Sequence, residues 1–564
     1  MTTLSSNAIE ILKDRYLLRD LKGTIIETPE ALFQRVAKHI ASAEDKDEKY
    51  WLSCYYDLMK NLKFLPNSPT LMNAGLPKGQ LSACFVLPIE DSLESIFTTL
   101  KNAALIHQSG GGTGYNFSKL RPEGDLVTGA GGTSSGPVAF MKIFDAATEY
   151  VKQGGKRRGA NMGILNINHP DIEAFIIAKT SGLTLSNFNI SVGISDHFMN
   201  AVSKNKLWPL INPHNGKVQK QIPAISLWEM IIKEAWKTGD PGLIFLDAIN
   251  KNNPTPYLGA ISSTNPCGEV PLLDYESCNL GSLNLVKVLE YKKGKATINW
   301  SQLEDMVKIA IRFLDNVIIK NHYLLPEIDE KTKMNRKIGL GVMGWAEMLM
   351  LLEIPYASEE AVLLAGKLMK FIKEKSYAAS ENLAKERGGF YRNKNRRNAT
   401  CNSIAPTGTI SVIANTSYSI EPLYALAYNR VGILGGKKQQ VFNHIFVNKM
   451  KSLNLWNESL KNEILASGSI QDNRKVPKNV KRYFQTSLEI PWEYHLQHQL
   501  AFQNYTDNAV SKTINLPQNS SQKDIASIYL TAWKSGLKGI TVYRDKSKVS
   551  QVLQKCNLNG SVSC

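Results

Sequence analysis

The sequence lacks any long hydrophobic run. Its best apolar stretch, residues 348–352, lies between Glu347 and Glu353, whereas a membrane-spanning helix needs about 20 consecutive apolar residues. The first residues also lack the basic segment and apolar segment that mark a secretory signal. We therefore expect a cytoplasmic protein with no membrane partner.

Disulfide and zinc motifs are missing as well. The seven cysteines are an odd number, are spread from Cys54 to Cys564, and include no Cys-x-x-Cys pair. In a reducing compartment such a set indicates neither a disulfide framework nor a zinc site. We expect no bound metal, and we expect some of the cysteines to be small core residues.

What the sequence does contain is enough apolar material for a large core. It has 564 residues, of which 43% are hydrophobic and 21% charged, so it is no disordered tail. A net charge of +17 favours phosphate-bearing partners. Charge alone does not choose between nucleotides, nucleic acid and anionic membranes.

The first sixty or so residues read as helices. Pro29 suits a first helical turn, and apolar residues at spacings of three and four follow it. A second helix is predicted from a capping box at Ser226 and Glu229, and it should end at Gly239. Beyond residue 65, short β-prone runs alternate with helical stretches, which predicts an α/β architecture with a largely parallel sheet. These runs are residues 82–87, 187–192, 243–246 and 338–342.

Four glycine-containing loops invite a nucleotide interpretation. Residues 339–344 match the dinucleotide fingerprint but follow a charged segment, so we favour a tight strand-to-helix packing turn there. Residues 109–114 and 405–411 are better placed, and in the second loop Gly408 permits close backbone approach to a phosphate. An ordinary capped helix start remains equally open for that loop. The basic loop at 153–159 suits a phosphate or a base edge, although a solvated charge run is the usual origin of such a string.

The most suggestive segment is Asn265-Pro-Cys-Gly-Glu269, with Cys278 eleven residues after the first thiol. Pro266 and Gly268 preclude a regular helix, so we expect a loop that presents an amide, a thiol and a carboxylate. These groups can orient hydroxyls, act in redox or radical chemistry, and accept a proton. From spacing alone, a structural turn remains as plausible as a site.

Taken together, these motifs closely resemble the catalytic subunit of ribonucleotide reductases, specifically the class II branch that depends on adenosylcobalamin. The resemblance covers nearly the whole chain. The segments that carry it are residues 67–75, 81–88, 91–96, 109–114, 153–159, 265–269, 276–282, 406–411 and 538–544.

The resemblance implies a ten-stranded α/β barrel, built from two antiparallel halves, with a central finger loop and a small N-terminal helical module. The implied divisions are a helical module at 1–65, a catalytic barrel at 66–545 and a flexible cysteine tail at 546–564. The implied activity is reduction of ribonucleotides, with diphosphates favoured, to 2′-deoxyribonucleotides for DNA synthesis.

The same resemblance assigns the chemical roles. Cys267 matches the cysteine that becomes a thiyl and abstracts the ribose 3′ hydrogen, after adenosylcobalamin supplies the radical. Glu269 matches the general base on the 3′ hydroxyl, and Asn265 matches the amide that orients the ribose. Cys84 and Cys278 match the pair that reduces the 2′ carbon, which requires Cα atoms about 4.4–6.8 Å apart. Cys54 and Cys401 match no catalytic position, so we expect them to be core cysteines.

Binding roles follow from the resemblance in the same way. The residues that match the substrate grip are Ser68, Ala83, Gly112, Pro406, Thr407, Gly408, Thr409 and Ile410. Those that match the site for a deoxynucleoside triphosphate or ATP specificity effector are Asp91, Ser92, Leu93, Arg121, Gln153 and Arg157. Cys556 and Cys564 match a tail that exchanges thiols with the active site, although relatives space this pair more closely. A thioredoxin- or glutaredoxin-type reductant and a homodimer are also implied.

Two other interpretations compete. A class I-like catalytic subunit would receive its radical from a metal-containing partner through two adjacent tyrosines, but here Val542 precedes the single Tyr543. A non-catalytic basic protein that binds nucleotides or RNA would show salt-dependent nucleic-acid binding. That alternative gives no reason for the three chemical side chains of residues 265–269 and the two further cysteines to occur together, so we expect no nucleic-acid partner.

Overall fold

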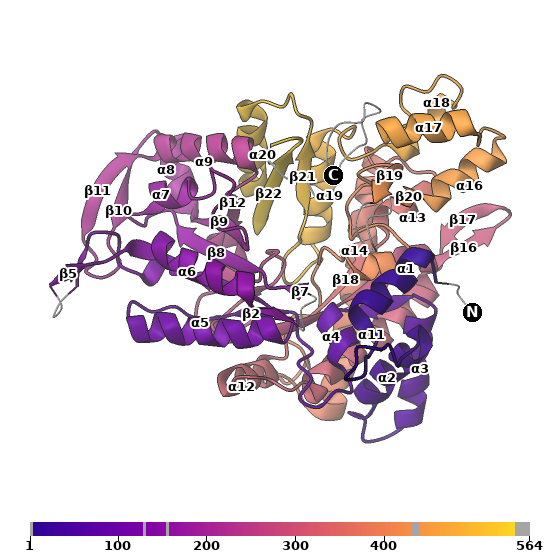
Figure 1. The fold of residues 1–564 in the computed structure, drawn as a ribbon, viewed down its shortest axis with the longest axis horizontal. Coiled ribbons are helices and arrows are strands. Elements are labelled where there is room, and N and C mark those ends of the chain that lie inside the picture. The colour runs from indigo at the N-terminus through magenta and orange to yellow at the C-terminus, as the bar shows by residue number, and fades with distance from the viewer. Residues whose placement is uncertain (1–3, 128–130, 154–156, 431–438, 548–564) are drawn as a thin grey trace.

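A computed structural model describes residues 4–127, 131–153, 157–430 and 439–547 (Figure 1). Cys556 and Cys564 lie outside the described residues. Within the described ranges, no helix is long and apolar enough to cross a membrane.

Four short helical elements open the chain: α1 (Ser6–Ile11), the π-helix η1 (Leu12–Tyr16), α2 (Pro29–Ala41) and α3 (Glu48–Lys60). The prediction for α2 is confirmed, because it begins at Pro29 and the Thr28 hydroxyl accepts a hydrogen bond from Ala31 N at 3.1 Å. Its apolar face is buried. The buried Glu44 carboxylate after α2 is paired with Arg312 and Arg387, so an ion-pair cluster ties this module to the barrel helices.

Ten strand segments form the barrel in two halves. The first half has five parallel strands: β2 (Cys84–Val86), β3 (Gly112–Asn116), β8 (Asn161–Asn166), β9 (Phe188–Ile194) and β12 (Gly242–Phe245). The second half contains β15 (Ser277–Asn284) parallel to β18 (Ile338–Met343), and β21 (Thr513–Leu516) parallel to β22 (Gly539–Arg544). The halves are joined by the antiparallel pairs β2–β15 and β12–β22.

Residues 402–404 complete the ring. Two isolated parallel bridges, Leu340 with Asn402 and Ile404 with Val510, place this segment between β18 and the residues that lead into β21. The strand order therefore returns to its start, with antiparallel joints only where the halves meet. The predicted ten-stranded barrel of two antiparallel halves is confirmed. Strand β1 (Phe64–Pro66) pairs with β15 outside this ring.

Helices cover the outside of the barrel (Figure 1). Those in the core of the first half include α5 (Leu93–Gln108), α6 (Gly136–Tyr150), α9 (Ala224–Thr238) and α20 (Gln522–Lys534). Those in the core of the second half include α11 (Trp300–Lys320), α14 (Glu359–Arg387) and α2 of the N-terminal module. Helix α19 (Trp492–Gln503) lies against both α14 and β21. Each half thus has its own hydrophobic core.

The remaining elements lie around this framework. The shorter helices are α4 (Ser68–Asn73), α7 (Ile172–Ile176), α8 (Asp196–Ser203), α10 (Leu246–Lys251), α12 (Pro326–Asn335), α13 (Trp345–Leu351), α15 (Ile410–Ile413), α16 (His444–Ser452), α17 (Glu458–Ser467) and α18 (Lys478–Lys481). Single 3-10 turns are η2 (Phe117–Lys119), η3 (Pro256–Leu258), η4 (Leu285–Val288) and η5 (Arg482–Phe484). The two-stranded sheets are β4 (Leu126–Val127) with β5 (Gly132–Thr133), β6 (Lys152–Gln153) with β7 (Arg157–Arg158), β10 (Leu207–Ile211) with β11 (Val218–Pro223), β13 (Ser263–Thr264) with β14 (Pro271–Leu272), β16 (Leu289–Lys292) with β17 (Lys295–Ile298), and β19 (Ala427–Arg430) with β20 (Gln439–Phe442).

One helix start was predicted wrongly. Helix α9 begins at Ala224 rather than after Ser226, and its N-cap residue is Pro223, which makes no side-chain cap. The strand β11 ends at Pro223, so the chain turns directly from strand to helix before the capping-box residues are reached. The predicted end at Gly239 is correct, because this glycine is the C-cap of α9 and has a left-handed φ of 77°.

The fingerprint-like glycines serve packing, as predicted. Gly339 and Gly341 lie inside β18, where a Cβ added to Gly341 would stand 2.3 Å from the Ser403 carbonyl oxygen. Gly344 then caps α13 with a φ of 85°. These glycines let the 402–404 segment approach β18, so they help to close the barrel.

Candidate active site

The Asn265–Glu269 motif lies in a hairpin formed by β13 and β14, which we call the finger. Strands β13 and β14 pair antiparallel, and the turn between them carries residues 265–270. The Asn265 carboxamide oxygen accepts a hydrogen bond from Val270 N at 3.0 Å, and Gly268 has a φ of 80°. The predicted loop over this motif is therefore a tight, internally bonded turn.

Both halves of the barrel hold the finger turn. Asn189, on β9 of the first half, donates to the Pro266 carbonyl oxygen at 2.8 Å. The Glu269 carbonyl oxygen accepts from the Ser403 hydroxyl and from Ala509 N, each at 2.8 Å, and both donors belong to the second half. The position of the turn is thus set by the two halves together.

The finger passes very close to β3. A Cβ on Gly114 would lie 1.7 Å from the Thr264 carbonyl oxygen, and a Cβ on Gly112 would lie 2.8 Å from a Pro266 ring carbon. Any side chain at Gly114 would displace the finger backbone. Part of the glycine loop at 109–114 is therefore explained by this approach rather than by a phosphate.

Two thiols face each other beside the finger. Cys84 on β2 and Cys278 on β15 are directly opposite cross-strand partners, which places their Cα atoms about 4.5–5.5 Å apart. This separation lies within the range that a disulfide needs. Both thiols are buried, and burial raises the pKa of each well above its usual value. Asn265 Nδ2 donates to Cys84 Sγ at 3.1 Å, which links the pair to the finger.

Glu269 is the carboxylate of the finger. Its side chain is buried, and burial raises its pKa to about 7, with the nearby Asn265 amide opposing the rise. Its Oε2 atom has no hydrogen-bond partner among the described residues. A carboxyl group that titrates near neutral pH in a closed site is suited to accept and return a proton.

These groups line one cavity of about 260 Å³. All eight residues predicted to grip a substrate line it: Ser68, Ala83, Gly112, Pro406, Thr407, Gly408, Thr409 and Ile410. Asn265, Cys267, Glu269 and Cys84 line it too, and Cys278 joins them through its pairing with Cys84. The structure therefore brings the sequence-predicted residues of this site together.

The loop at 405–410 has an unusual backbone. Thr407 adopts a left-handed φ of 56°, which is rare for a β-branched residue. Its hydroxyl accepts a hydrogen bond from Ser419 N at 2.8 Å, which holds this conformation. A Cβ on Gly408 would meet nothing within 4 Å, so the backbone there is open toward the cavity. Helix α15 follows after Thr409 and is only four residues long.

Cys267 also borders a second, larger cavity of about 510 Å³. Pro266, Cys267 and Pro406 line both cavities, so the tip of the finger forms the wall between them. The larger cavity is lined by residues of β9, β12, β21 and β22, together with Tyr418, Tyr424 and Tyr543. The Cys267 side chain is exposed. A ligand in the second cavity could therefore reach the thiol from the side opposite the first cavity.

The predicted effector residues lie elsewhere. Ser92 caps α5 by accepting from Ser95 N at 3.1 Å, and Leu93 is the first residue of that helix. Arg121 forms an ion pair with Asp91 at 2.8 Å. Gln153 and Arg157 are cross-strand neighbours in the antiparallel pair β6–β7, and β6 lies against α5. Both predicted groups thus adjoin one helix.

Sequence reasoning did not single out Asn67 or Tyr16 at this site. Asn67 lines the first cavity, and the Tyr16 hydroxyl lies 2.7 Å from Ser68 Oγ. The sequence Asn67-Ser-Pro-Thr70 carries the signal of an N-cap but not of a cavity. Of the two cysteines predicted to lie in the core, Cys401 is buried, which confirms that prediction, whereas Cys54 is only partly buried, so the prediction for Cys54 was wrong.

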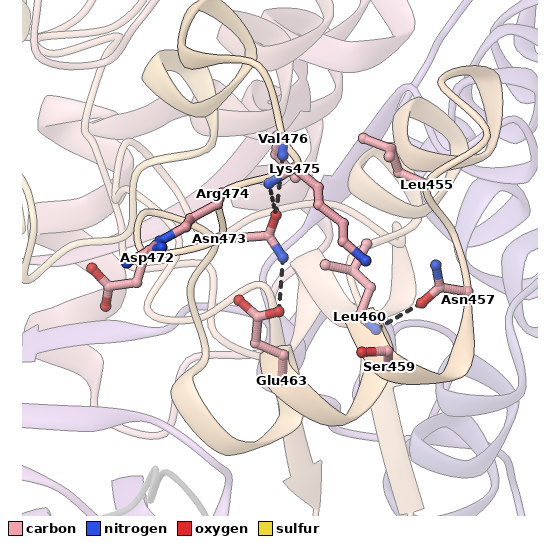
Figure 2. Close-up of a pocket in the computed structure, with 10 residues that line it drawn as sticks. All are labelled: Leu455, Asn457, Ser459, Leu460, Glu463, Asp472, Asn473, Arg474, Lys475 and Val476. Atoms are coloured by element: carbon pink, nitrogen blue, oxygen red, sulfur yellow. Dashed lines mark hydrogen bonds between the residues drawn. The ribbon is translucent and has the colours of Figure 1, made fainter.

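Another cavity, of about 280 Å³, lies away from this chemistry (Figure 2). It is formed by α17 and the loop at 472–476, and Figure 2 shows Asn457 accepting a hydrogen bond from Leu460 N. None of the predicted site residues lines it. Within the described residues, no group of three or more His, Cys, Asp or Glu side chains could hold a metal ion.

Comparison with known proteins identifies related chains. Two family descriptions match: "Ribonucleotide reductase, all-alpha domain" over residues 2–79, and "Ribonucleotide reductase, barrel domain" over residues 82–396 and 392–543. The vitamin B12-dependent ribonucleoside-diphosphate reductase of Thermoplasma acidophilum is 47% identical over 620 residues, which covers 98% of this chain and 80% of that protein. Its counterpart in Mycobacterium tuberculosis strain CDC 1551 is 48% identical over 563 residues, with the same coverage. Among solved structures, the Actinobacillus ureae class Id ribonucleotide reductase alpha subunit matches with a TM-score of 0.80 and 25% identity, over 97% of this chain and 99% of that one.

Proposed function

This chain belongs to the ribonucleotide reductase family, and from that premise we propose that it reduces ribonucleoside diphosphates to 2′-deoxyribonucleotides with adenosylcobalamin as its radical source. It is an oxidoreductase of deoxyribonucleotide synthesis. The diphosphate substrate and the cofactor are those named for the relatives that are 47% and 48% identical.

One observation carries this proposal. A single cavity brings together the finger residues Asn265, Cys267 and Glu269 with a cross-strand pair of thiols. A reaction that removes a ribose hydroxyl needs a hydrogen-atom acceptor, a proton acceptor and a two-electron reductant. These side chains supply all three.

We propose the following roles for these side chains, which the geometry supports. The Cys267 thiyl takes the 3′ hydrogen atom, while the Glu269 carboxylate takes the proton of the 3′ hydroxyl and Asn265 orients the ribose. The 2′ carbon–oxygen bond then breaks and the oxygen leaves as water. Cys84 and Cys278 supply two electrons and two protons and end as a disulfide. The 3′ hydrogen atom returns from Cys267 and Glu269 gives its proton back to the 3′ oxygen, so the thiyl and the carboxylate are both regenerated.

We place the proposed cofactor in the larger cavity, because Cys267 borders it as well as the first cavity. The larger cavity opens directly on the exposed Cys267 thiol, and three tyrosines line it. When bound, adenosylcobalamin supplies the radical that converts this thiol to a thiyl. The finger turn separates that event from the nucleotide, because Pro266 and Pro406 stand in the walls of both cavities.

Residues on and beside α5 are the basis for our proposals on effector binding and on dimer formation. We assign the deoxynucleoside triphosphate or ATP effector to Asp91, Ser92, Leu93 and Arg121, with Gln153 and Arg157 relaying its identity to base choice. Adjacent helices α5 and α6 expose large apolar side chains: Leu93, Phe97, Leu105, Ile143 and Tyr150. A second copy of this chain would cover that face as a homodimer, beside the effector residues.

The tail and the chain divisions complete the proposal. We assign residues 1–65 to a helical module, 66–545 to the catalytic barrel and 546–564 to a redox tail. Cys556 and Cys564 would pass electrons from a thioredoxin- or glutaredoxin-type reductant to the buried thiol pair by thiol exchange. The basis is the burial of Cys84 and Cys278, which no external protein thiol could reach directly.

An anaerobic turnover assay tests the function. The purified chain is incubated with adenosylcobalamin, dithiothreitol, CDP or CTP and a panel of deoxynucleoside triphosphates, beside Cys267→Ala. We expect cobalamin-dependent deoxynucleotide formation that the variant abolishes. An intact, nucleotide-binding protein that forms no product would favour a class I-like subunit that needs a radical-generating partner.

A further inference from the structure

Two buried side chains that line the substrate cavity leave a polar atom without a hydrogen-bond partner in the described structure. One is Glu269, the proposed proton acceptor, whose Oε2 is unpartnered. The other is Asn67, whose Nδ2 is unpartnered although the residue is only 7% exposed. A buried, unmet donor is costly, so a donor at this place calls for a ligand.

Two hydrogen bonds fix the Asn67 side chain, and a third fixes its backbone. Its Oδ1 accepts from Thr70 N at 2.9 Å and from the Thr70 hydroxyl at 3.0 Å. Because a backbone N–H must donate, the bonded atom is the oxygen and the remaining one is the NH₂ group. The backbone N–H of Asn67 also donates to the Leu280 carbonyl oxygen at 2.8 Å. The donor is therefore held in place before any ligand arrives.

Packing places Asn67 on the same side of the cavity as the 405–410 loop. Helix α4 starts one residue after Asn67 and contacts η1, while α15 follows the loop and contacts α1. Since α1 and η1 are consecutive in the chain, both segments rest on the same part of the N-terminal module. The Tyr16 hydroxyl of η1 also meets Ser68.

We propose that Asn67 Nδ2 donates a hydrogen bond to a phosphate oxygen of the ribonucleotide substrate, an inference that rests on the proposed function. The amide nitrogen offers only donors, and a phosphate oxygen is the strongest acceptor a nucleotide has. The ribose hydroxyls are already assigned to Asn265 and Glu269. Ser68 and Thr409, which flank the same space, add hydroxyl donors.

The test separates this donor from the cap that the same side chain forms. Asn67→Ser keeps a good N-cap for α4 but removes the amide donor, and Asn67→Asp keeps the cap acceptor while placing a carboxylate toward the phosphate. Binding of CDP, cytidine and inorganic pyrophosphate is measured by calorimetry on the full chain. We expect the Kd for CDP and for pyrophosphate to rise about tenfold or more in Asn67→Ser, more still in Asn67→Asp, and cytidine binding to stay unchanged.

The matched control is Asn457→Ser, which changes the N-cap of α17 at the distant cavity of Figure 2 and should leave all three affinities unaltered. Thermal melts show that each variant is folded. Equal CDP binding by wild type and both Asn67 variants would overturn this inference alone. A loss that depends on the base, with pyrophosphate unaffected, would overturn the phosphate assignment. A wild-type chain that binds no nucleotide would overturn the proposed function as well.

Discussion

Glu269 should make the stability of this protein depend on pH in a defined direction. Burial raises its carboxyl pKa from 4.5 to about 7 in the folded chain. The folded state therefore holds this proton more tightly than the unfolded state, and the resulting stabilisation is full below pH 4.5 and is lost as pH rises through about 7. A pKa change of this size corresponds to about 3 kcal/mol in the free energy of unfolding.

Glu269→Gln removes the titration while keeping the shape of the side chain. Between pH 5 and pH 8, the free energy of unfolding of the wild type should fall by about 2.5 kcal/mol relative to that of the variant. Because the side chain is almost fully buried, solvent screening does not reduce this figure.

The assay is urea denaturation of both proteins at four pH values from 5 to 8, followed by intrinsic tryptophan fluorescence. The difference between the two unfolding free energies is plotted against pH. In parallel, kcat/KM of the wild type should rise with pH and level off above about 7, since the base acts only as the carboxylate. A pH-independent difference between the two proteins would refute the reasoning, because Glu269 would then titrate alike in both states.

Three further outcomes are expected. A single turnover without external reductant should oxidise Cys84 and Cys278 to one disulfide, seen by peptide mapping; a different pairing would contradict their assignment as reductants. Tyr16→Phe should raise KM for the nucleotide severalfold with little change in kcat, because it frees Ser68 from its hydrogen bond; a fall in kcat alone would place its role elsewhere. Arg121→Gln should weaken deoxynucleoside triphosphate binding about tenfold in equilibrium dialysis, through loss of its cation and of the pair with Asp91; unchanged binding would argue against that site.

The sequence predicted those features that depend on neighbouring residues. Thr28 and Pro29 specify the start of α2 by local capping chemistry, and Gly239 ends α9 because it tolerates a left-handed φ. The capping box at Ser226 failed because the end of β11 at Pro223 fixes where the chain turns.

Contacts between distant segments could not be obtained from local pattern. Cys84 and Cys278 are 194 residues apart in the chain. Before the strand register showed that they are paired, only the family resemblance indicated it. Asn67 was overlooked for the same reason. Its pattern predicts a helix cap, whereas its proposed role at the cavity depends on β15, which is far from it in the chain, and on the packing of α4 against η1.

The finger turn has a consequence for how such proteins can be recombined. Its backbone is bonded to Asn189 of one half-barrel and to Ser403 and Ala509 of the other. A chimera that joined half-barrels from two relatives would take the hydrogen-bond donors that anchor the finger from different parents. The positions of Cys267 and Glu269 would then match those of neither parent. The two halves and the finger should therefore be inherited as one block, and functional crossovers are expected in the outer helices rather than between the halves.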